Sequence, residues 1–165
     1  MDRAAQVRLI ADHGNLCGEC PVWDPASAVL YWTDNAAAKF YRYEPSSGKH
    51  GLANDGTPIN GFRLNRAGGF VIANNAGIWL WDGAAKISLL CDSVEGARCQ
   101  MNDCVADPAG RLISGSQFYD AGRNYELGKL IRVDVDGAVA ILDEGFHLSN
   151  GLAFSPDGSI LYFAD

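Results

Sequence analysis

The alternation of apolar runs and turn signals repeats four times along the chain. Each repeat has a small apolar run, a turn built on Asp, Asn or Ser followed by Pro or Arg, and a second run rich in β-branched and aromatic residues. The repeats span Pro21 to Asp34, Phe62 to Asn74, Cys104 to Ser116 and Gly151 to Asp165. Their turns recur about every 40–50 residues, which is the spacing of propeller blades. The pattern therefore predicts antiparallel hairpins arranged as blades.

Further strand signals lie between these repeats. Strand-like segments alternate around turns at Pro45–Gly48, Asn74–Gly77, Asp82–Gly83 and Asp136–Gly137, and Asp-Gly is a strong hairpin signal. No segment long enough for a helix carries a 3.6-residue apolar period, so we expect very little helix. The sequence thus predicts an all-β fold, a partial β-propeller of about three blades and the first strands of a fourth.

The predicted ring is not closed, because three blades and the start of a fourth do not complete a propeller. The last segment, Ile160 to Asp165, is an apolar strand with no later strand to pair with, and intact domains avoid such edges. We therefore expect residues 1–165 to be the N-terminal, truncated part of one propeller domain, with open blade edges that favour self-association. The long connection Gln117 to Gly128 is expected either to cover one mouth of the ring or to decorate the surface.

Composition narrows the class of protein. The net charge of −7 argues against nucleic-acid binding, which needs an electropositive face. No apolar run approaches the length of a membrane span, and the N-terminus carries no signal-peptide pattern. Five cysteines form an odd set that favours reduced thiols, so we expect a cytoplasmic location.

A polar residue precedes the turn unit in every repeat. The set consists of Glu19, Asn60, Asn102 with its neighbour Asp103, and Asn150. Residues at the start of the innermost strand of each blade converge on one mouth of a propeller, so we expect these side chains to face one axis. Carboxylate and carboxamide oxygens suit Ca²⁺, Mg²⁺ or Mn²⁺. The alternative is that Asn-Gly and Asn-Asp pairs simply form turns, and the pattern leaves both interpretations open.

Two other groups offer weaker metal or acid–base hypotheses. Cys17 and Cys20, with Cys99 and Cys104, are four thiols that a zinc site would need, but they fall in different blades, so buried reduced cysteines are the preferred interpretation. His147 lies three residues before Asn150 and is expected near the channel mouth or in a plain loop.

Several motifs resemble those of the SMP-30/gluconolactonase family, which includes regucalcin and sugar lactonases. The resemblance rests on GECPVWDPASAVLYWTD, YRYEPSSGK, MNDCVADPAGRLISGS and LSNGLAFSPDGSILYFAD, and it covers essentially the whole chain. It implies a six-bladed propeller with one divalent cation in the central channel. It also implies hydrolysis of sugar lactones.

The resemblance assigns roles to individual residues. Glu19 and Asn150 match metal ligands, and Asn102 matches a residue that contacts substrate or metal-bound water. Asp103 is expected near the same mouth. The family's third ligand, an Asp proposed as the catalytic base, belongs to a later blade beyond Asp165, so no catalytic residue is assigned within this chain.

Two positions depart from the family pattern. Gln100 stands where sugar lactonases often have Arg, and we expect it to contact substrate. Cys20 replaces the Gly of the G-E-G-P pattern, a change that is tolerable where the backbone does not need a positive φ.

The expected function is metal-dependent hydrolysis of a sugar lactone. The resemblance implies one divalent cation (Ca²⁺, Zn²⁺, Mn²⁺ or Mg²⁺), with an incomplete site in this chain, which we therefore expect to be inactive alone. A non-catalytic cation-binding or interaction propeller and a strictosidine synthase-like propeller are the alternatives. Converging oxygen ligands favour the hydrolase, because a bare interaction scaffold does not need them.

Overall fold

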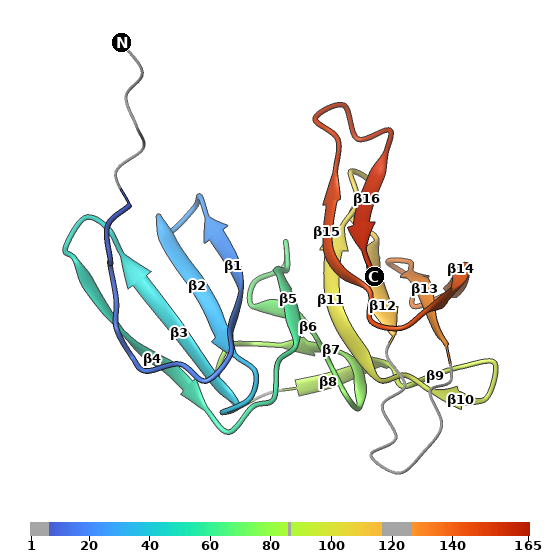
Figure 1. The fold of residues 1–165 in the computed structure, drawn as a ribbon, viewed down its shortest axis with the longest axis horizontal. Coiled ribbons are helices and arrows are strands. Elements are labelled where there is room, and N and C mark those ends of the chain that lie inside the picture. Colours follow the sequence, from blue (N-terminus) through green and yellow to red (C-terminus); the bar gives the residue numbers. More distant parts are fainter. Residues whose placement is uncertain (1–6, 86, 117–126) are drawn as a thin grey trace.

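The computed structural model describes residues 7–85, 87–116 and 127–165 (Figure 1). Within these ranges every regular element is a β-strand and every strand pairing is antiparallel. The prediction of an all-β fold is therefore confirmed. Most of the long connection predicted between Gln117 and Gly128, residues 117–126, lies outside the described residues.

Three four-stranded sheets follow one another, each with its strands in sequence order. The first contains β1 (Gly18–Asp24), β2 (Val29–Asp34), β3 (Lys39–Glu44) and β4 (Lys49–Asp55). The second contains β5 (Gly61–Leu64), β6 (Phe70–Asn74), β7 (Gly77–Trp81) and β8 (Ile87–Cys91). The third contains β11 (Met101–Ala106), β12 (Leu112–Ser116), β13 (Gly128–Val133) and β14 (Val139–Phe146). Two hairpins complete the set, β9 (Ser93–Val94) with β10 (Ala97–Arg98), and β15 (Asn150–Phe154) with β16 (Leu161–Ala164).

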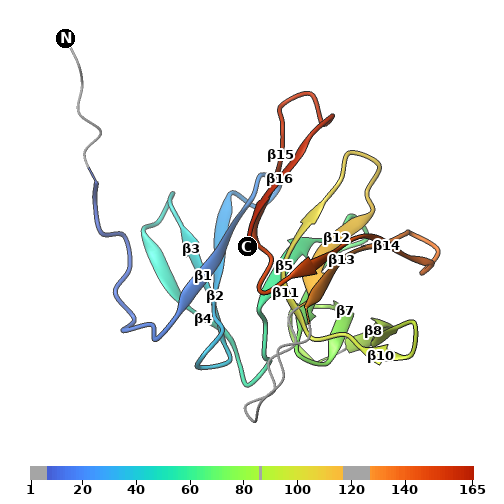
Figure 2. The same cartoon turned by 45° about the vertical axis from the view of Figure 1, so that its right-hand side comes forward.

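The sheets lie along an arc with their first strands on its inner side (Figures 1 and 2). β5 contacts both β1 and β11, and β11 in turn contacts β15. The four inner strands β1, β5, β11 and β15 therefore border one central region, although they are far apart in sequence.

Apolar side chains fill the spaces between neighbouring sheets. Between the first and second sheets, Phe40 packs edge-to-face on Phe62 and Trp81, with ring centroids 4.9 and 5.3 Å apart. Between the second and third sheets, Ile78 and Met101 are fully buried in a second cluster. Each sheet buries its faces against its neighbours, which is how repeat architectures gain most of their stability.

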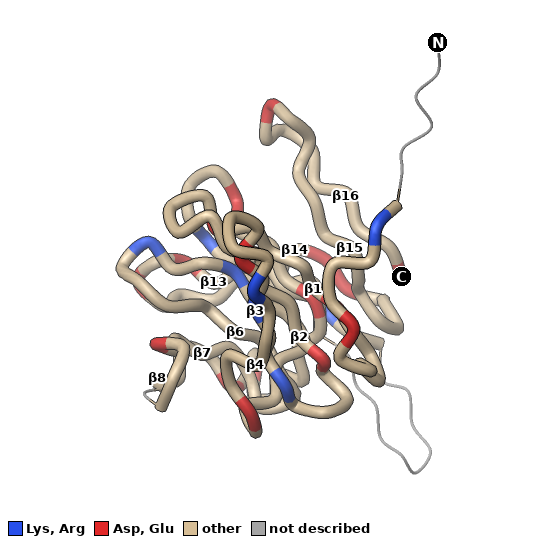
Figure 3. Tube along the Cα trace, turned by 90° about the vertical axis from the view of Figure 1, so that its left-hand side faces the viewer, with Lys and Arg blue, Asp and Glu red and all other residues tan. Residues whose placement is uncertain are grey.

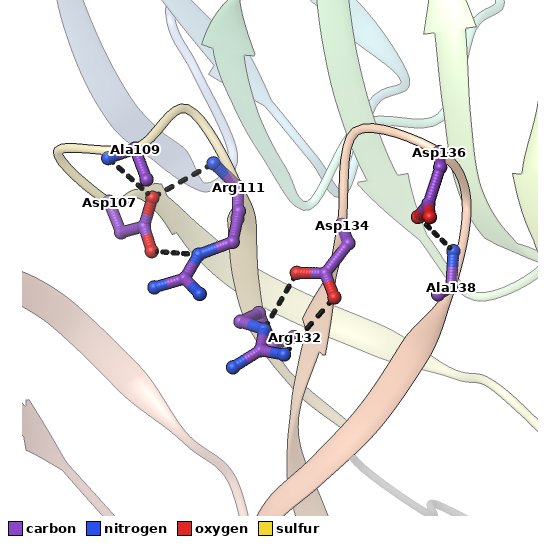
Figure 4. A network of polar contacts seen from close by, with 7 residues as sticks. All are labelled: Asp107, Ala109, Arg111, Arg132, Asp134, Asp136 and Ala138. Carbon is purple, nitrogen blue, oxygen red and sulfur yellow. Dashed lines mark hydrogen bonds and ion pairs between the residues drawn. The ribbon is translucent and has the colours of Figure 1, made fainter.

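Local hydrogen bonds close the turns at the end of the inner strands, opposite to the end where these strands begin. Asp107, after β11, accepts bonds from the backbone N–H groups of Ala109 and Arg111, both 2.9 Å, and from Arg111 Nε at 2.5 Å (Figure 4). Burial alone would raise the pKa of Asp107, but these bonds and the Arg111 charge hold it below its ordinary value. In the same view Arg132 Nε donates to Asp134 at 2.7 Å.

A carboxylate after the second strand holds the segment that leads into the inner strand. Asp34, at the end of β2, accepts bonds from the N–H groups of Leu16 at 2.9 Å and Cys17 at 3.0 Å. Asp165, just after β16, accepts bonds from the N–H groups of His147 at 2.6 Å and Leu148 at 2.8 Å. These two carboxylates therefore position the chain immediately before β1 and β15.

Acidic and basic residues are interspersed along the chain, many of them near turns (Figure 3). Acidic residues outnumber basic ones, which gives the net charge of −7. The described part of the chain contains no helix that could cross a bilayer.

Candidate functional site

A pocket of about 380 Å³ lies where the inner strands begin. Residues in or next to all four inner strands line it: Glu19, Cys20, Pro21, Asn60, Arg63, Asp103, Asn150, Gly151 and Leu152. A larger hollow of about 510 Å³ is lined only by residues of the first sheet, mostly from β3 and β4. The smaller pocket is the candidate site because it alone of these two gathers polar groups from distant parts of the sequence.

Glu19 projects from an irregular stretch at the start of β1. The pairing register with β2 shifts between Glu19 and Val22, as in a β-bulge, and such irregularities commonly redirect a side chain. Glu19 Oε2 accepts a hydrogen bond from Asn35 Nδ2 at 3.1 Å, and Oε1 accepts one from Cys17 Sγ at 3.5 Å. These two bonds fix the orientation of the carboxylate beside the pocket.

Cys20 has a left-handed backbone, with φ of +50°. The Gly-to-Cys departure therefore falls at a position that does need a positive φ, where a side chain costs about 1–2 kcal/mol. Its Sγ accepts bonds from the Phe62 N–H at 3.4 Å and from Arg63 Nη1 at 3.2 Å. Burial is the main reason that the pKa of the thiol is raised. The thiol thus links β1 to β5 as a neutral acceptor.

Asn60 and Asp103 connect neighbouring inner strands. Asn60 Nδ2 donates to the Met101 carbonyl oxygen at 2.8 Å. Asp103 Oδ1 accepts a bond from the Cys104 N–H at 2.7 Å, and Oδ2 accepts a longer one from the Leu152 N–H at 3.4 Å. Both side chains therefore line the pocket and also hold its walls together.

Asn150 and Asn102 occupy matching places in their repeats but differ in exposure. Asn150 is exposed and lines the pocket, and its Oδ1 accepts a bond from the Gly151 N–H at 3.0 Å. Asn102 is only 6% exposed, and its Nδ2 donates to the Ser149 carbonyl oxygen at 3.1 Å. The buried Ser149 carbonyl needs such a donor. The Asn102 side chain is thus directed toward the segment just before β15, and Asn102 is not among the lining residues. Gln100, just before β11, is not among them either.

The cysteines and His147 do not form a metal centre in the described part of the chain. No three or more His, Cys, Asp or Glu side chains gather there as a metal-binding group. All five cysteines are free, and burial is the main reason that the pKa of Cys99 rises to about 12. His147 Nδ1 lies 3.3 Å from Asp165 Oδ2 and does not line the pocket.

Arg63 is a lining residue that the sequence analysis did not single out. It lies in β5, and a single Arg in a strand is usually an ordinary surface residue. The repeat alignment carries one usable signal, because the matching residues Val22, Val105 and Ala153 are apolar. The Arg63 side chain instead lines the pocket, where its Nη1 donates to Cys20 Sγ and to the Phe62 carbonyl oxygen.

Comparisons with known proteins identify the family of this chain. Residues 17–165 match the family described as SMP-30/Gluconolactonase/LRE-like region. A 6-deoxy-6-sulfogluconolactonase of Pseudomonas putida is 33% identical over 96% of this chain and 55% of that protein. A pentonolactonase of Haloferax volcanii is 30% identical over 96% of this chain and 53% of that protein. The solved structure of a calcium-binding protein, regucalcin of Agrobacterium tumefaciens, has a TM-score of 0.79 at 25% identity, over 96% of this chain and 53% of that one.

The chain spans about half the length of the relatives it matches. The family match runs from Cys17 to Asp165 and so includes every residue that lines the pocket. The expected resemblance is confirmed: this chain belongs to the SMP-30/gluconolactonase/LRE-like family.

Proposed function

We propose that this chain is part of a six-bladed β-propeller that hydrolyses sugar lactones with one divalent cation. In this proposal the three four-stranded sheets are three blades, and β15 with β16 begins a fourth. The single observation that carries the proposal is the shared pocket, in which Glu19 and Asn150 lie with Asn60 and Asp103. Asn60 and Asp103 also hold the pocket walls together, but oxygen atoms from four inner strands around one space are the arrangement that binding a cation or a polar ligand needs.

The names of the relatives support the substrate class. One is a 6-deoxy-6-sulfogluconolactonase and another a pentonolactonase, and both names denote lactones of sugar acids. A third relative is described as calcium-binding. A sugar lactone is therefore the proposed substrate, and Ca²⁺, Zn²⁺, Mn²⁺ or Mg²⁺ the proposed cofactor.

The donor types in the pocket fit a divalent cation. Glu19 offers a carboxylate oriented by Asn35, and Asn150 offers an exposed carboxamide, both of which are hard oxygen ligands. When bound, such a cation would polarise a lactone carbonyl as a Lewis acid. Two protein ligands are few, since Ca²⁺ usually takes about 6–8 oxygens in all. We therefore predict weak cation binding by residues 1–165 alone.

The other polar residues would shape the pocket. In this proposal Asp103 and Asn60 line the substrate space, while Asn102 acts through the Ser149 carbonyl that directly precedes Asn150. Gln100 lies one residue before β11, at the edge of the same region, and its proposed substrate contact requires a substrate that extends beyond the pocket lining. No catalytic base is proposed among residues 1–165.

Hydrolysis of D-glucono-δ-lactone, followed by pH-stat titration, tests the proposal. A chain extended to the length of its relatives should hydrolyse the lactone, lose the activity in EDTA and regain it on adding Ca²⁺, Mn²⁺ or Zn²⁺. Stoichiometric cation binding without hydrolysis of any sugar lactone would instead favour a non-catalytic cation-binding propeller. Calorimetric titration of residues 1–165 provides the second measurement, and a micromolar site would contradict the predicted weak binding.

A further inference from the structure

Arg63 is the one cationic side chain among the described residues that line the candidate pocket. It lies in β5 and is partly buried. Nη1 donates to the Phe62 carbonyl oxygen at 2.6 Å and to Cys20 Sγ at 3.2 Å. Nε and Nη2 have no hydrogen-bond acceptor within the described residues, and a guanidinium carries five N–H donors in all. Most of its donor capacity is therefore unused.

Among the described residues, no carboxylate forms an ion pair with the positive charge of Arg63. Its sulfur neighbours Cys20 and Cys104 are neutral at neutral pH, because burial raises the pKa of both thiols. Asp103, the nearby carboxylate, accepts bonds from backbone N–H groups instead. A partly buried charge in this condition favours an anion beside it.

The scaffold itself does not require a charge at this position. The matching residues of the other repeats, two positions before the turn residue, are Val22, Val105 and Ala153. Three of the four inner strands are therefore built with an apolar side chain there. The repeat therefore does not explain the charge of Arg63, which needs a reason of its own.

The guanidinium faces the candidate pocket. Arg63 also borders a second hollow of about 340 Å³ between the second and third sheets, so its side chain forms part of the wall between the two. Its Nη1 nitrogen contacts Cys20, which lines the candidate pocket and not the second hollow. Burial lowers the pKa of Arg63, but the nearby groups of Cys104, Cys20 and Asp103 raise it overall, and Cys20 and Asp103 both line the candidate pocket. The charge therefore lies on the same side as Glu19 and Asn150.

We propose that Arg63 binds an acidic substituent of the ligand and so makes this pocket selective for anionic over neutral sugar lactones. The chemical class is a sugar-acid lactone that carries a second acidic group, a carboxylate, sulfonate or phosphate, away from the reacting carbonyl. Arg suits this task because its planar donors pair with tetrahedral or planar oxyanions. The identity of the reacting group rests on the proposed lactone hydrolysis, whereas the anion contact does not.

Calorimetric titration of the 165-residue chain with 6-phosphogluconate and with gluconate tests the proposal. Both ligands carry the C1 carboxylate that hydrolysis would produce, and only the first carries a second acidic group. We expect 6-phosphogluconate to bind about 10–100-fold more tightly, the range for charge-assisted hydrogen bonds. Arg63→Met should reduce this ratio to within about twofold, and Arg63→Lys should restore part of it.

Arg66 supplies the matched control, since it is an exposed Arg in the turn after β5 and does not line the pocket. Arg66→Met should keep the full ratio. An unchanged ratio in Arg63→Met, equal affinity of the wild-type chain for both ligands, or no binding of either ligand would overturn the proposal. A parallel loss of gluconate and 6-phosphogluconate binding in Arg63→Met would also overturn it, because Arg63 would then hold the C1 carboxylate.

Two further measurements keep the outcome decisive. Should Arg63→Met fail to fold, the side-chain Nε–H resonance of Arg63 in the unmodified chain should shift with 6-phosphogluconate and not with gluconate, and a resonance that stays in place overturns the proposal. Failure of lactone hydrolysis by the extended chain would reject the proposed function. The binding ratio would still decide the role of Arg63, so the two failures are distinguishable.

Discussion

The two ends of the inner strands use the same polar residue types in opposite ways. At the turn end, the side chain of Asp107 bonds only to residues two and four positions further on, Ala109 and Arg111 (Figure 4). At the pocket end, Asn60 bonds to Met101, 41 residues away. Asn102 and Asp103 likewise bond to Ser149 and Leu152, 47 and 49 residues away.

This difference separates residues that shape a strand from residues that build a site. A turn aspartate is satisfied within its own loop, so its role is complete once the loop has formed. At the pocket end, Asn60, Asn102 and Asp103 form bonds between sheets. Glu19 and Asn150 have only local bonds and place their oxygen atoms beside the common pocket. The contrast predicts that substitutions at the turn end change stability, whereas those at the pocket end change ligand chemistry.

Glu19→Gln paired with Asp24→Asn tests the contrast within one strand. Glu19 lies near the start of β1 at the pocket, and Asp24 ends the strand at a turn, where its carboxylate accepts a hydrogen bond from the Ala26 N–H at 3.0 Å. In an extended chain that hydrolyses lactones, Glu19→Gln should lower kcat/KM at least ~100-fold, since changing even a supporting residue of a metal site costs 10–100-fold. Asp24→Asn should leave kcat/KM within about twofold and lower only the unfolding midpoint in urea. Equal kinetic losses in both variants would refute the distinction.

Asp34→Asn should lower the free energy of unfolding at neutral pH and should make that free energy less sensitive to acid. Burial alone would raise the pKa of Asp34, but bonds from the Cys17, Leu16 and Ala37 N–H groups lower it overall. A group whose folded-state pKa is lowered stabilises the fold above its unfolded value of about 3.9 and loses that contribution as the pH falls toward the folded value. We expect a loss of about 2 kcal/mol at pH 7. The difference between the variant and wild type should therefore shrink as the pH falls from about 4 toward the folded-state pKa of Asp34.

Urea unfolding measured between neutral pH and about pH 3 checks this expectation. Asp157→Asn is the control, because hydrogen bonds from Ser155 and Ser159 lower the pKa of Asp157 to about 2 but all lie within one exposed turn. Its neutral-pH loss should be smaller than that of Asp34→Asn. A constant difference between Asp34→Asn and wild type across the whole range would contradict the assigned pKa direction.

Asp107→Ala should cost about 1–2 kcal/mol in the free energy of unfolding, within the range for hydrogen-bonding groups left without a partner. The loss arises because the N–H groups of Ala109 and Arg111 lose their acceptor. Asp136→Ala removes only one exposed bond, to Ala138 at 3.0 Å, and should cost less. Neither variant should alter the 6-phosphogluconate to gluconate affinity ratio, and a changed ratio would show that the turn end also controls the pocket.

The sequence predicts the turn end far better than the pocket end, for a physical reason. Turns such as Pro45–Gly48 and Asp136–Gly137 follow from residues next to one another, and the structure has strands on both sides of each. The register of Glu19 with Asn150 follows from the repeat, so their common pocket was also open to prediction. The buried position of Asn102 depends on its bond to the Ser149 carbonyl. The position of the Arg63 guanidinium depends on its bond to the Cys20 thiol. Contacts of this kind between sheets leave no local pattern.

Cys20→Gly has the smallest expected effect, because two contributions oppose each other. Glycine relieves the left-handed strain at φ of +50°, by about 1 kcal/mol, but removes the sulfur acceptor for Phe62 N–H and Arg63 Nη1. The net change in unfolding free energy should stay within about 1 kcal/mol. Cys20→Ala loses the acceptor and keeps the strain, so it should be about 1 kcal/mol less stable than Cys20→Gly in urea. Equal stability of the two variants would mean that the thiol, and not the backbone conformation, dominates at this position, and that the pocket end owes its form to side-chain contacts alone.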